Sequence, residues 1–142
     1  MGRKIQEKLS PAKVVFACVE NAGRSQMAAA IFNQLANPRR AKAISAGTHP
    51  KDEVHPEVVA VMRELDIDIS SARPQYLTID LTRDAHILIT MGCSDQCPLV
   101  SGVERDEWPL DDPREKPIET VRQIRDDIRA RIVALIKERR WT

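Results

Sequence analysis

The segment VVFACVENAGRS, residues 14–25, constrains the fold more than any other part of the chain. Its first four residues, 14–17, are apolar and predict a buried strand. Apolar residues then recur at helical spacing over 27–35 and stop before Asn37-Pro38, which predicts a helix soon after the loop. A strand followed within a few residues by a helix is the repeating unit of parallel α/β sheets.

The rest of the chain repeats this alternation. Its pattern predicts strands over 41–46 and 86–90, a weaker strand over 103–108, helices over 56–65 and 118–139, and a short helical turn near the end of 66–82. We therefore expect a single α/β domain over 13–142. It would be a three-layer sandwich, with a four-stranded parallel sheet and helices on both faces. Residues 1–12 are polar and charged, and we expect them to form an N-terminal extension.

Length and charge exclude several classes of function. The 142 residues carry 22 Lys and Arg against 21 Asp and Glu, so there is little electrostatic attraction for nucleic acid or an anionic membrane. No apolar run is long enough to span a bilayer, and the start MGRKIQEKLSPAK lacks the apolar centre of a signal peptide. We expect a cytoplasmic, monomeric protein whose thiols are kept reduced.

The three cysteines are too few for a disulfide framework. They indicate thiol chemistry or metal binding, with simple burial as the alternative. Cys93 and Cys97 could form half of a zinc site, but His49, His55 and His86 lack the spacing of further ligands. We therefore predict no metal site.

The loop between the first predicted strand and helix has the composition of a cradle for a tetrahedral oxyanion. Its backbone N–H groups can point inward, and the helix adds its positive end. Gly23 and Asn21 tolerate unusual backbone geometry, Arg24 can bind two oxygens at once, and Ser25 can donate to the sulfur of Cys18. The same surroundings favour a nucleophilic thiolate. The predicted anion-binding residues are Val19, Glu20, Asn21, Ala22, Gly23, Arg24 and Ser25.

The alternative is that Cys18 is a small buried residue and Arg24 a solvated charge at the start of a helix. The strand before the loop, the helix after it and the Asn and Gly within it all favour the cradle.

The stretch CVENAGRSQMA resembles the phosphate loop of the low-molecular-weight protein tyrosine phosphatases, and more closely that of the arsenate reductases that share their fold. The similarity continues in the same order through ISAGTHP, VHPEVVAVMRELDIDIS, ILITMGCSDQCP and EWPLDDP, over residues 13 to about 138.

This resemblance implies an arsenate reductase that serves arsenic detoxification through three sulfurs. Cys18 attacks arsenate, Cys93 attacks Cys18 as arsenite leaves, and Cys97 attacks Cys93 to leave a Cys93–Cys97 disulfide. An external dithiol, such as thioredoxin, then reduces that disulfide, and no cofactor is bound. The resemblance also implies that Asp112 is the general acid–base group, with Asp111 as a solvated or structural neighbour.

Disulfide geometry adds a corollary. In a helix the Cβ atoms of Cys93 and Cys97 would lie about 5–6 Å apart, whereas a disulfide needs about 3.5–4.5 Å. Gly92 and Pro98 disfavour a helix at either end of this segment. We therefore expect a redox-driven rearrangement of residues 91–103 that exposes the disulfide to the external dithiol.

Four further residues concern the surroundings of the loop. Asn21 and Ser45 are expected to brace it by hydrogen bonds. Some reductases hold a potassium ion behind this loop with a glutamate at the position of Ala29, so we predict no potassium site here. Asp68 could hydrogen-bond near the loop or lie at the surface.

Two other functions remain open. Phosphatases of this fold follow the acid with tyrosines, but here Arg114-Glu115 follow it and the chain has one tyrosine, Tyr76. The aromatic wall for a phosphotyrosine ring is thus missing, which favours a small inorganic anion. A phosphatase acting on phosphotyrosine or small phosphate esters is the main alternative, and a redox or anion sensor is the weaker one.

Overall fold

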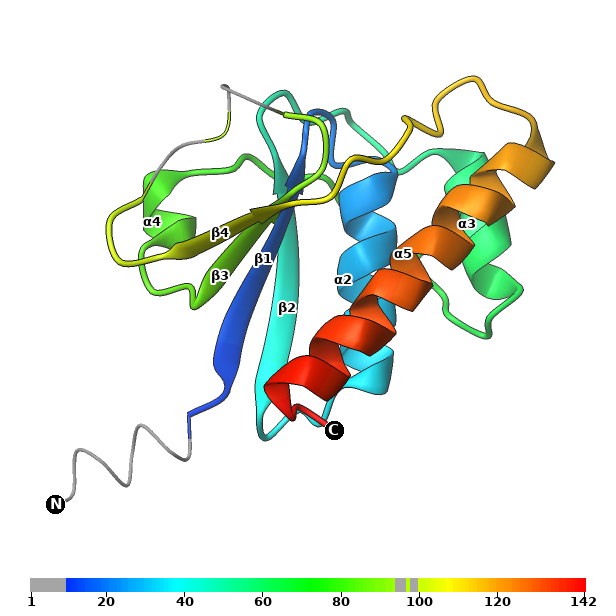
Figure 1. Cartoon of the computed structure of the whole chain (residues 1–142). Coiled ribbons are helices and arrows are strands. Elements are labelled where there is room, and N and C mark those ends of the chain that lie inside the picture. Colours follow the sequence, from blue (N-terminus) through cyan, green and yellow to red (C-terminus); the bar gives the residue numbers. More distant parts are fainter. Residues whose placement is uncertain (1–9, 94–96, 98–99) are drawn as a thin grey trace, which may run out of the picture.

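Four parallel strands form the centre of the structure, a computed structural model that describes residues 10–93, 97 and 100–142 (Figure 1). The strands are β1 (Ala12–Cys18), β2 (Ala41–Gly47), β3 (Ile87–Thr90) and β4 (Glu104–Glu107), in the spatial order β2-β1-β3-β4. Every neighbouring pair is parallel. The predicted four-stranded parallel sheet is confirmed. Residues 1–9 of the expected extension lie outside the described residues, and β1 begins at Ala12.

The helices cover the two faces of the sheet unequally. Helices α2 (Arg24–Leu35), α3 (Pro56–Arg63) and α5 (Ile118–Arg139) lie on one face, and the four-residue α4 (Ile79–Thr82) lies on the other (Figure 1). The expectation of helices on both faces is confirmed. The predicted helix over 118–139 has those bounds, whereas the one predicted over 56–65 ends at Arg63.

Strand β1 is buried on both faces, as expected for a central parallel strand. Val14 and Phe16 belong to the large core beneath α2, α3 and α5, whereas Val15 and Ala17 belong to a smaller core on the α4 face. Phe16 packs against Phe32 and Trp108, with ring centroids 6.0 and 5.6 Å away. This alternation places consecutive side chains of β1 in different environments.

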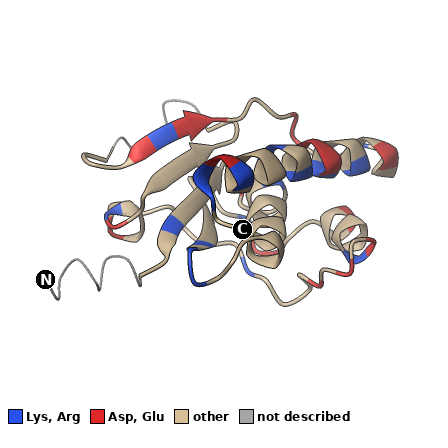
Figure 2. Cartoon of the chain, turned by 60° about the horizontal axis from the view of Figure 1, so that its bottom comes forward, with Lys and Arg blue, Asp and Glu red and all other residues tan. Residues whose placement is uncertain are grey.

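The outer strand β4 reads ERDE and has no apolar residue. Figure 2 shows its charged residues along the free edge of the sheet. Charged side chains on an edge strand discourage pairing with another chain. The strand is formed by its pairing with β3 and not by an apolar pattern of its own. Its sequence therefore predicts a strand here only weakly. No helix within the described ranges is long and apolar enough to cross a membrane.

Candidate active site

Three chain segments meet where the central strands end. In the register of the sheet, Cys18 lies opposite Gly47 and Ala17 lies opposite Thr90. The loop after β1, the loop after β2 and the segment after β3 therefore share one edge. Ligands of open parallel sheets bind at this carboxyl edge.

The loop of residues 18–23 is wrapped by the chain that follows β2. Its carbonyl groups all accept hydrogen bonds from outside the loop: Thr48 N to Cys18 O (3.2 Å), His49 N to Val19 O (2.7 Å), Lys51 N to Glu20 O (3.0 Å), Gln26 Nε2 to Asn21 O (3.1 Å) and His55 N to Ala22 O (3.0 Å). In a trans peptide the C=O and the following N–H point in opposite directions, and the described residues have no cis bonds. The N–H groups of residues 19–23 therefore face the inside of the loop. This geometry is the one that the predicted anion cradle requires.

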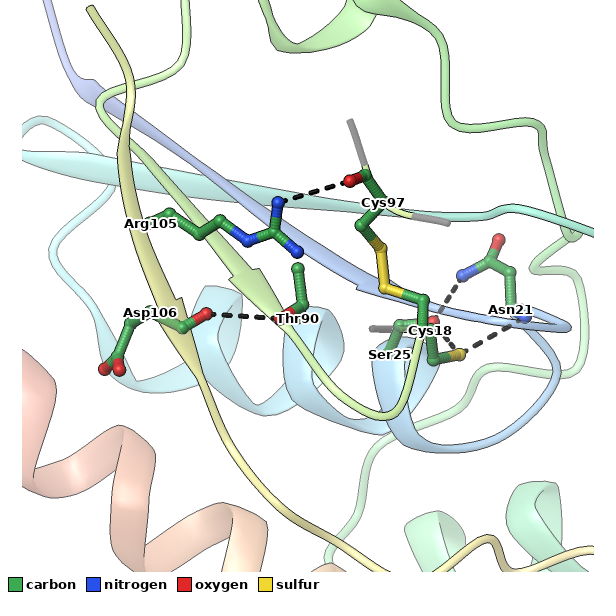
Figure 3. The surroundings of a disulfide bond; sticks show 8 residues. Cys18, Asn21, Ser25, Thr90, Cys97, Arg105 and Asp106 are labelled. Carbon is green, nitrogen blue, oxygen red and sulfur yellow. Dashed lines mark hydrogen bonds between the residues drawn. A yellow bond between two sulfur atoms is a disulfide. The ribbon is translucent and has the colours of Figure 1, made fainter. Parts of the chain in front are cut away.

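The sulfur of Cys18 lies within this cradle. Cys18 is 2% exposed, and its Sγ lies 3.3 Å from Asn21 N and 2.9 Å from Ser25 Oγ (Figure 3). Asn21 Nδ2 donates to the same Ser25 Oγ at 2.7 Å, so the hydroxyl hydrogen of Ser25 remains for the sulfur. The sulfur therefore faces two hydrogen-bond donors, Asn21 N and Ser25 Oγ.

Asn21 is the structural centre of the loop. It is fully buried and has a φ of 52°, in the left-handed region that asparagine tolerates. Its Oδ1 accepts from Gln75 N at 2.9 Å, which identifies the other side-chain atom as the Nδ2 that donates to Ser25. The expected bracing role of Asn21 is thus seen directly. Ser45 acts more remotely, because its carbonyl accepts from Gln75 Nε2 at 2.9 Å.

Arg24 begins α2 and is 7% exposed. Its Nη1 donates to Leu110 O at 3.1 Å, and its Nη2 lies 3.7 Å from Asp112 Oδ2. Its buried Nε has no hydrogen-bond partner within the described residues. A buried guanidinium N–H without a partner fits a site that receives an anion.

Two glycines allow the neighbouring segments to approach this arginine and its loop. Gly92 has a φ of 88°, and a Cβ built there would lie 2.5 Å from Arg24 Nη1. A Cβ on Gly23 would lie 2.7 Å from Pro113 Cγ. The segment after β3 and the loop that carries Asp112 therefore both rest on the cradle. The sequence suggested backbone freedom at Gly23 and Gly92 but not these contacts.

Asp112 lies at the rim of the site with its side chain half exposed. Its Oδ1 accepts from Arg114 N at 2.9 Å, which leaves Oδ2 toward Arg24. The structure thus brings the predicted acid to the predicted anion-binding arginine. Asp68 is not part of the site, because its Oδ1 accepts from Ser70 N at 2.9 Å on the surface.

Cys93 and Cys97 form a disulfide, with Cα atoms 5.7 Å apart, while Cys18 is free. Both bonded cysteines pack with Val15 and Ala17 in the small core on the α4 face, whereas Cys18 belongs to the large core. Arg105 Nη1 donates to Cys97 O at 3.2 Å (Figure 3). Residues 94–96 and 98–99, which include Pro98, lie outside the described residues.

The expectation that the disulfide would be exposed is wrong for this state. Cys93 and Cys97 are each 3% exposed. The physical reason is that side chains following β3 can fill the thinly covered α4 face, where they join apolar residues of β1. Sequence position alone does not say which face of the sheet such a segment covers.

Several supporting groups were not predicted. Gln26 and Gln75 hold Asn21, and the chain over 48–55 donates N–H groups to the outward carbonyl groups of the cradle. The carbonyl of Leu110 accepts from Arg24. No group of three or more His, Cys, Asp or Glu that could hold a metal ion occurs within residues 10–93, 97 and 100–142.

A thiol at the carboxyl edge of a parallel sheet, in a loop of inward N–H groups closed by an arginine, defines a cysteine-dependent class of proteins that act on tetrahedral oxyanions. Residues 13–140 match the family described as low molecular weight phosphotyrosine protein phosphatase, and the chain belongs to this family.

Its similar proteins include named arsenate reductases. A Halobacterium salinarum protein provisionally named an arsenate reductase is 42% identical over 134 residues, which cover 91% of this chain and 94% of the relative. The arsenate reductase of Staphylococcus aureus strain Newman is 32% identical over 124 residues, covering 84% and 92%. A thioredoxin-dependent arsenate reductase from Corynebacterium glutamicum superimposes with a TM-score of 0.78 and 36% identity. That match covers 95% of this chain but 64% of the Corynebacterium chain.

Proposed function

We propose that this protein reduces arsenate to arsenite in the cytoplasm as a monomer, without a bound cofactor, and that an external dithiol such as thioredoxin regenerates it. One observation carries the proposal: a free Cys18 in an anion cradle is combined with a Cys93–Cys97 disulfide after the neighbouring strand. A phosphatase mechanism needs one sulfur, whereas supplying two electrons to arsenate requires thiols that end as a disulfide.

The first step is formation of a bond between sulfur and arsenic. The inward N–H groups of 19–23 and the fork of Arg24 bind the oxygens of arsenate. The thiolate of Cys18, facing the hydroxyl of Ser25, attacks arsenic. One arsenate oxygen leaves as water, and Asp112 supplies the proton that this oxygen needs.

The second and third steps transfer the oxidation to the other two sulfurs. The thiolate of Cys93 attacks the sulfur of Cys18, the sulfur–arsenic bond breaks, and its electron pair stays on arsenic, which leaves as arsenite. The thiolate of Cys97 then attacks the sulfur of Cys93 and releases the thiolate of Cys18. In sum, two thiols become a disulfide and arsenic(V) becomes arsenic(III). The disulfide-bonded structure corresponds to the end of this sequence.

The relay requires movement of the segment that carries the second sulfur. In the disulfide state Cys93 is held in the small core on the α4 face, while Cys18 belongs to the core on the other face. Gly92 and Gly102, with φ values of 88° and 83°, lie near the two ends of the stretch 91–103 that the proposal requires to rearrange, and glycine tolerates such a change of backbone conformation. Because the disulfide is buried, an external dithiol also needs this segment to open.

Phosphate ester hydrolysis is the second candidate, and membership of a phosphatase family favours it. A cavity of about 420 Å³ beside the cradle is lined by Val19, Glu20, Asp111, Asp112, Arg114, Glu115 and Lys116. No aromatic residue is among these described residues. Tyr76, 67% exposed, instead pairs with Gly47 at the end of β2 through an isolated parallel bridge. This lining offers no aromatic wall for a phosphotyrosine ring.

A cysteine series assayed with both substrates tests the proposal. Arsenate turnover is measured with thioredoxin and its reductase, and hydrolysis with an aryl phosphate. We expect Cys18→Ser to lose both activities. Cys93→Ser should lose arsenate turnover and keep any aryl phosphatase activity of the wild type. Cys97→Ser should stop after one turnover and accumulate a Cys18–Cys93 disulfide, which peptide mass spectrometry detects.

Multiple arsenate turnovers by both Cys93→Ser and Cys97→Ser would overturn the three-sulfur relay. A wild-type protein that hydrolyses aryl phosphate but reduces no arsenate would instead support the phosphatase alternative.

A further inference from the structure

Glu20 is an acidic residue within the anion cradle, and its side chain is 16% exposed. Three basic side chains surround it. Its Oε2 lies 3.1 Å from Arg114 Nη1 and 3.6 Å from Lys51 Nζ, and its Oε1 lies 3.5 Å from His55 Nε2. A carboxylate here opposes the binding of an anion by simple charge repulsion. The arrangement of its partners suggests what it contributes in return.

Arg114 connects Glu20 to the loop that carries the acid. The main-chain N–H of Arg114 donates to Asp112 Oδ1 at 2.9 Å, while its guanidinium donates to Glu20 Oε2 at 3.1 Å. One residue therefore contacts both the acid and the cradle. Residues 20 and 114 are 94 positions apart, so this contact ties together two separate segments.

Two further contacts hold the acid loop. Arg24 Nη1 donates to Leu110 O at 3.1 Å, before Asp112, and Pro113, directly after it, rests against Gly23. The ion pair with Glu20 holds the chain beyond Pro113. Removing this ion pair would leave the chain after Asp112 held only by the contact of Pro113 with Gly23.

We propose that Glu20 is a positioning residue, which holds Asp112 over the oxyanion cradle through its ion pair with Arg114. The proposal rests on the function proposed above and extends it, because the sequence assigned Glu20 only a role in binding the anion. Lys51 and His55 are less able to do this. Their main-chain N–H groups already bind Glu20 O and Ala22 O, so their segment stays attached to the cradle without the side-chain pairs.

The test uses four variants: Glu20→Gln, Arg114→Met, their combination, and Lys51→Met as the matched control. Lys51→Met removes a cation from the same carboxylate but leaves the acid loop tied. For Glu20→Gln and Arg114→Met we expect kcat for arsenate to fall about 10-fold, which lies between the loss of an exposed ion pair and the roughly 100-fold effect of a misplaced catalytic group. KM should stay within about 2-fold, and so should kcat of the control. The kcat of the double variant should be no lower than that of either single variant.

The sign of the Glu20→Gln effect separates positioning from a simple charge effect. If Glu20 acts only by its charge, the substitution removes repulsion, and kcat/KM rises. If Glu20 positions the acid, kcat falls. A kcat at or above the wild-type value, or a double variant whose loss is the product of the two single losses, would overturn the proposal.

Amide exchange gives a readout that does not depend on arsenate reduction. The Arg114 amide donates to Asp112 Oδ1 within the acid loop, so we expect NMR to show faster exchange of this amide in Glu20→Gln, where the loop loses its tie to the cradle, but not in Lys51→Met. Inorganic phosphate binding, measured by calorimetry, should not weaken in Glu20→Gln, because the substitution removes a negative charge from the cradle. If the wild type reduces no arsenate, the proposed function fails while this comparison still decides the tie. An unchanged exchange rate in Glu20→Gln would overturn it.

Discussion

Replacing Asn21 tests whether one buried side chain holds the cradle in shape. Asn21 is fully buried at a φ of 52°. Its Nδ2 donates to Ser25 Oγ at 2.7 Å, and its Oδ1 accepts from Gln75 N at 2.9 Å and from Gln26 Nε2 at 3.2 Å. These bonds connect the loop to the start of α2 and to a segment 54 residues away.

The magnitude follows from what Asn21→Ala leaves behind. Buried polar groups without partners cost about 1–3 kcal/mol. A left-handed conformation at an alanine adds about 1 kcal/mol. We therefore expect the free energy of unfolding to fall by about 2–4 kcal/mol. Because a domain of this kind has only about 5–15 kcal/mol in total, the loss should be easily measured.

Asn21→Gly is the matched variant, because glycine adopts the same φ without strain but removes the same hydrogen bonds. Its free energy of unfolding should fall by about 1–3 kcal/mol. The assay is urea unfolding followed by circular dichroism, carried out on the disulfide-bonded and on the reduced protein. Both variants should also weaken phosphate binding. The reasoning is refuted if the free energy of unfolding of Asn21→Gly lies within about 0.5 kcal/mol of the wild-type value.

Two further predictions concern other parts of the structure. Gly92→Ala places a Cβ 2.5 Å from Arg24 Nη1 at a φ of 88°, so phosphate affinity measured by calorimetry should fall about 10-fold or more. Gly102→Ala is the control, because its φ of 83° gives the same backbone strain but a Cβ there has nothing within 4 Å. Equal losses of phosphate affinity in the two variants would contradict the role of the Arg24 contact. Hydrogen bonds from Arg122 are the main cause that lowers the pKa of Glu64 from 4.5 to about 2. A lowered pKa stabilises the fold above the unfolded value, so this contribution is lost as the pH falls from 4.5 toward about 2. Glu64→Gln should therefore flatten the dependence of the free energy of unfolding on pH in this window. If wild type and variant show the same dependence on pH there, the prediction is contradicted.

The cradle was predictable because its parts are close together in the chain. The strand, the loop and the helix that bear Cys18, Asn21 and Arg24 lie within residues 12–35. The spacing of apolar residues and the Asn and Gly of the loop carry this information locally. The same holds for the helix over 118–139, whose apolar stripe set its predicted bounds.

The placement of the second and third sulfurs was only partly predictable. Sequence order put Cys93 after β3, and hence at the same edge of the sheet as Cys18. It did not show that Cys93 and Cys97 would be buried with Val15 and Ala17 on the α4 face. That outcome depends on how thinly α4 covers this face, which no pattern near the cysteines records.

The sequence by itself determined the order of strands and helices, the position of the nucleophilic thiol and the presence of three sulfurs. Those features follow from side-chain periodicity and from residues that are neighbours in the chain. Only the tertiary structure decided what surrounds the thiol: Gln75 on Asn21, Gly92 on Arg24, and Arg114 on Glu20. Such contacts join segments about 50 to 95 residues apart. They arise from the packing of loops at the end of the sheet, where neither periodicity nor backbone preference specifies a partner.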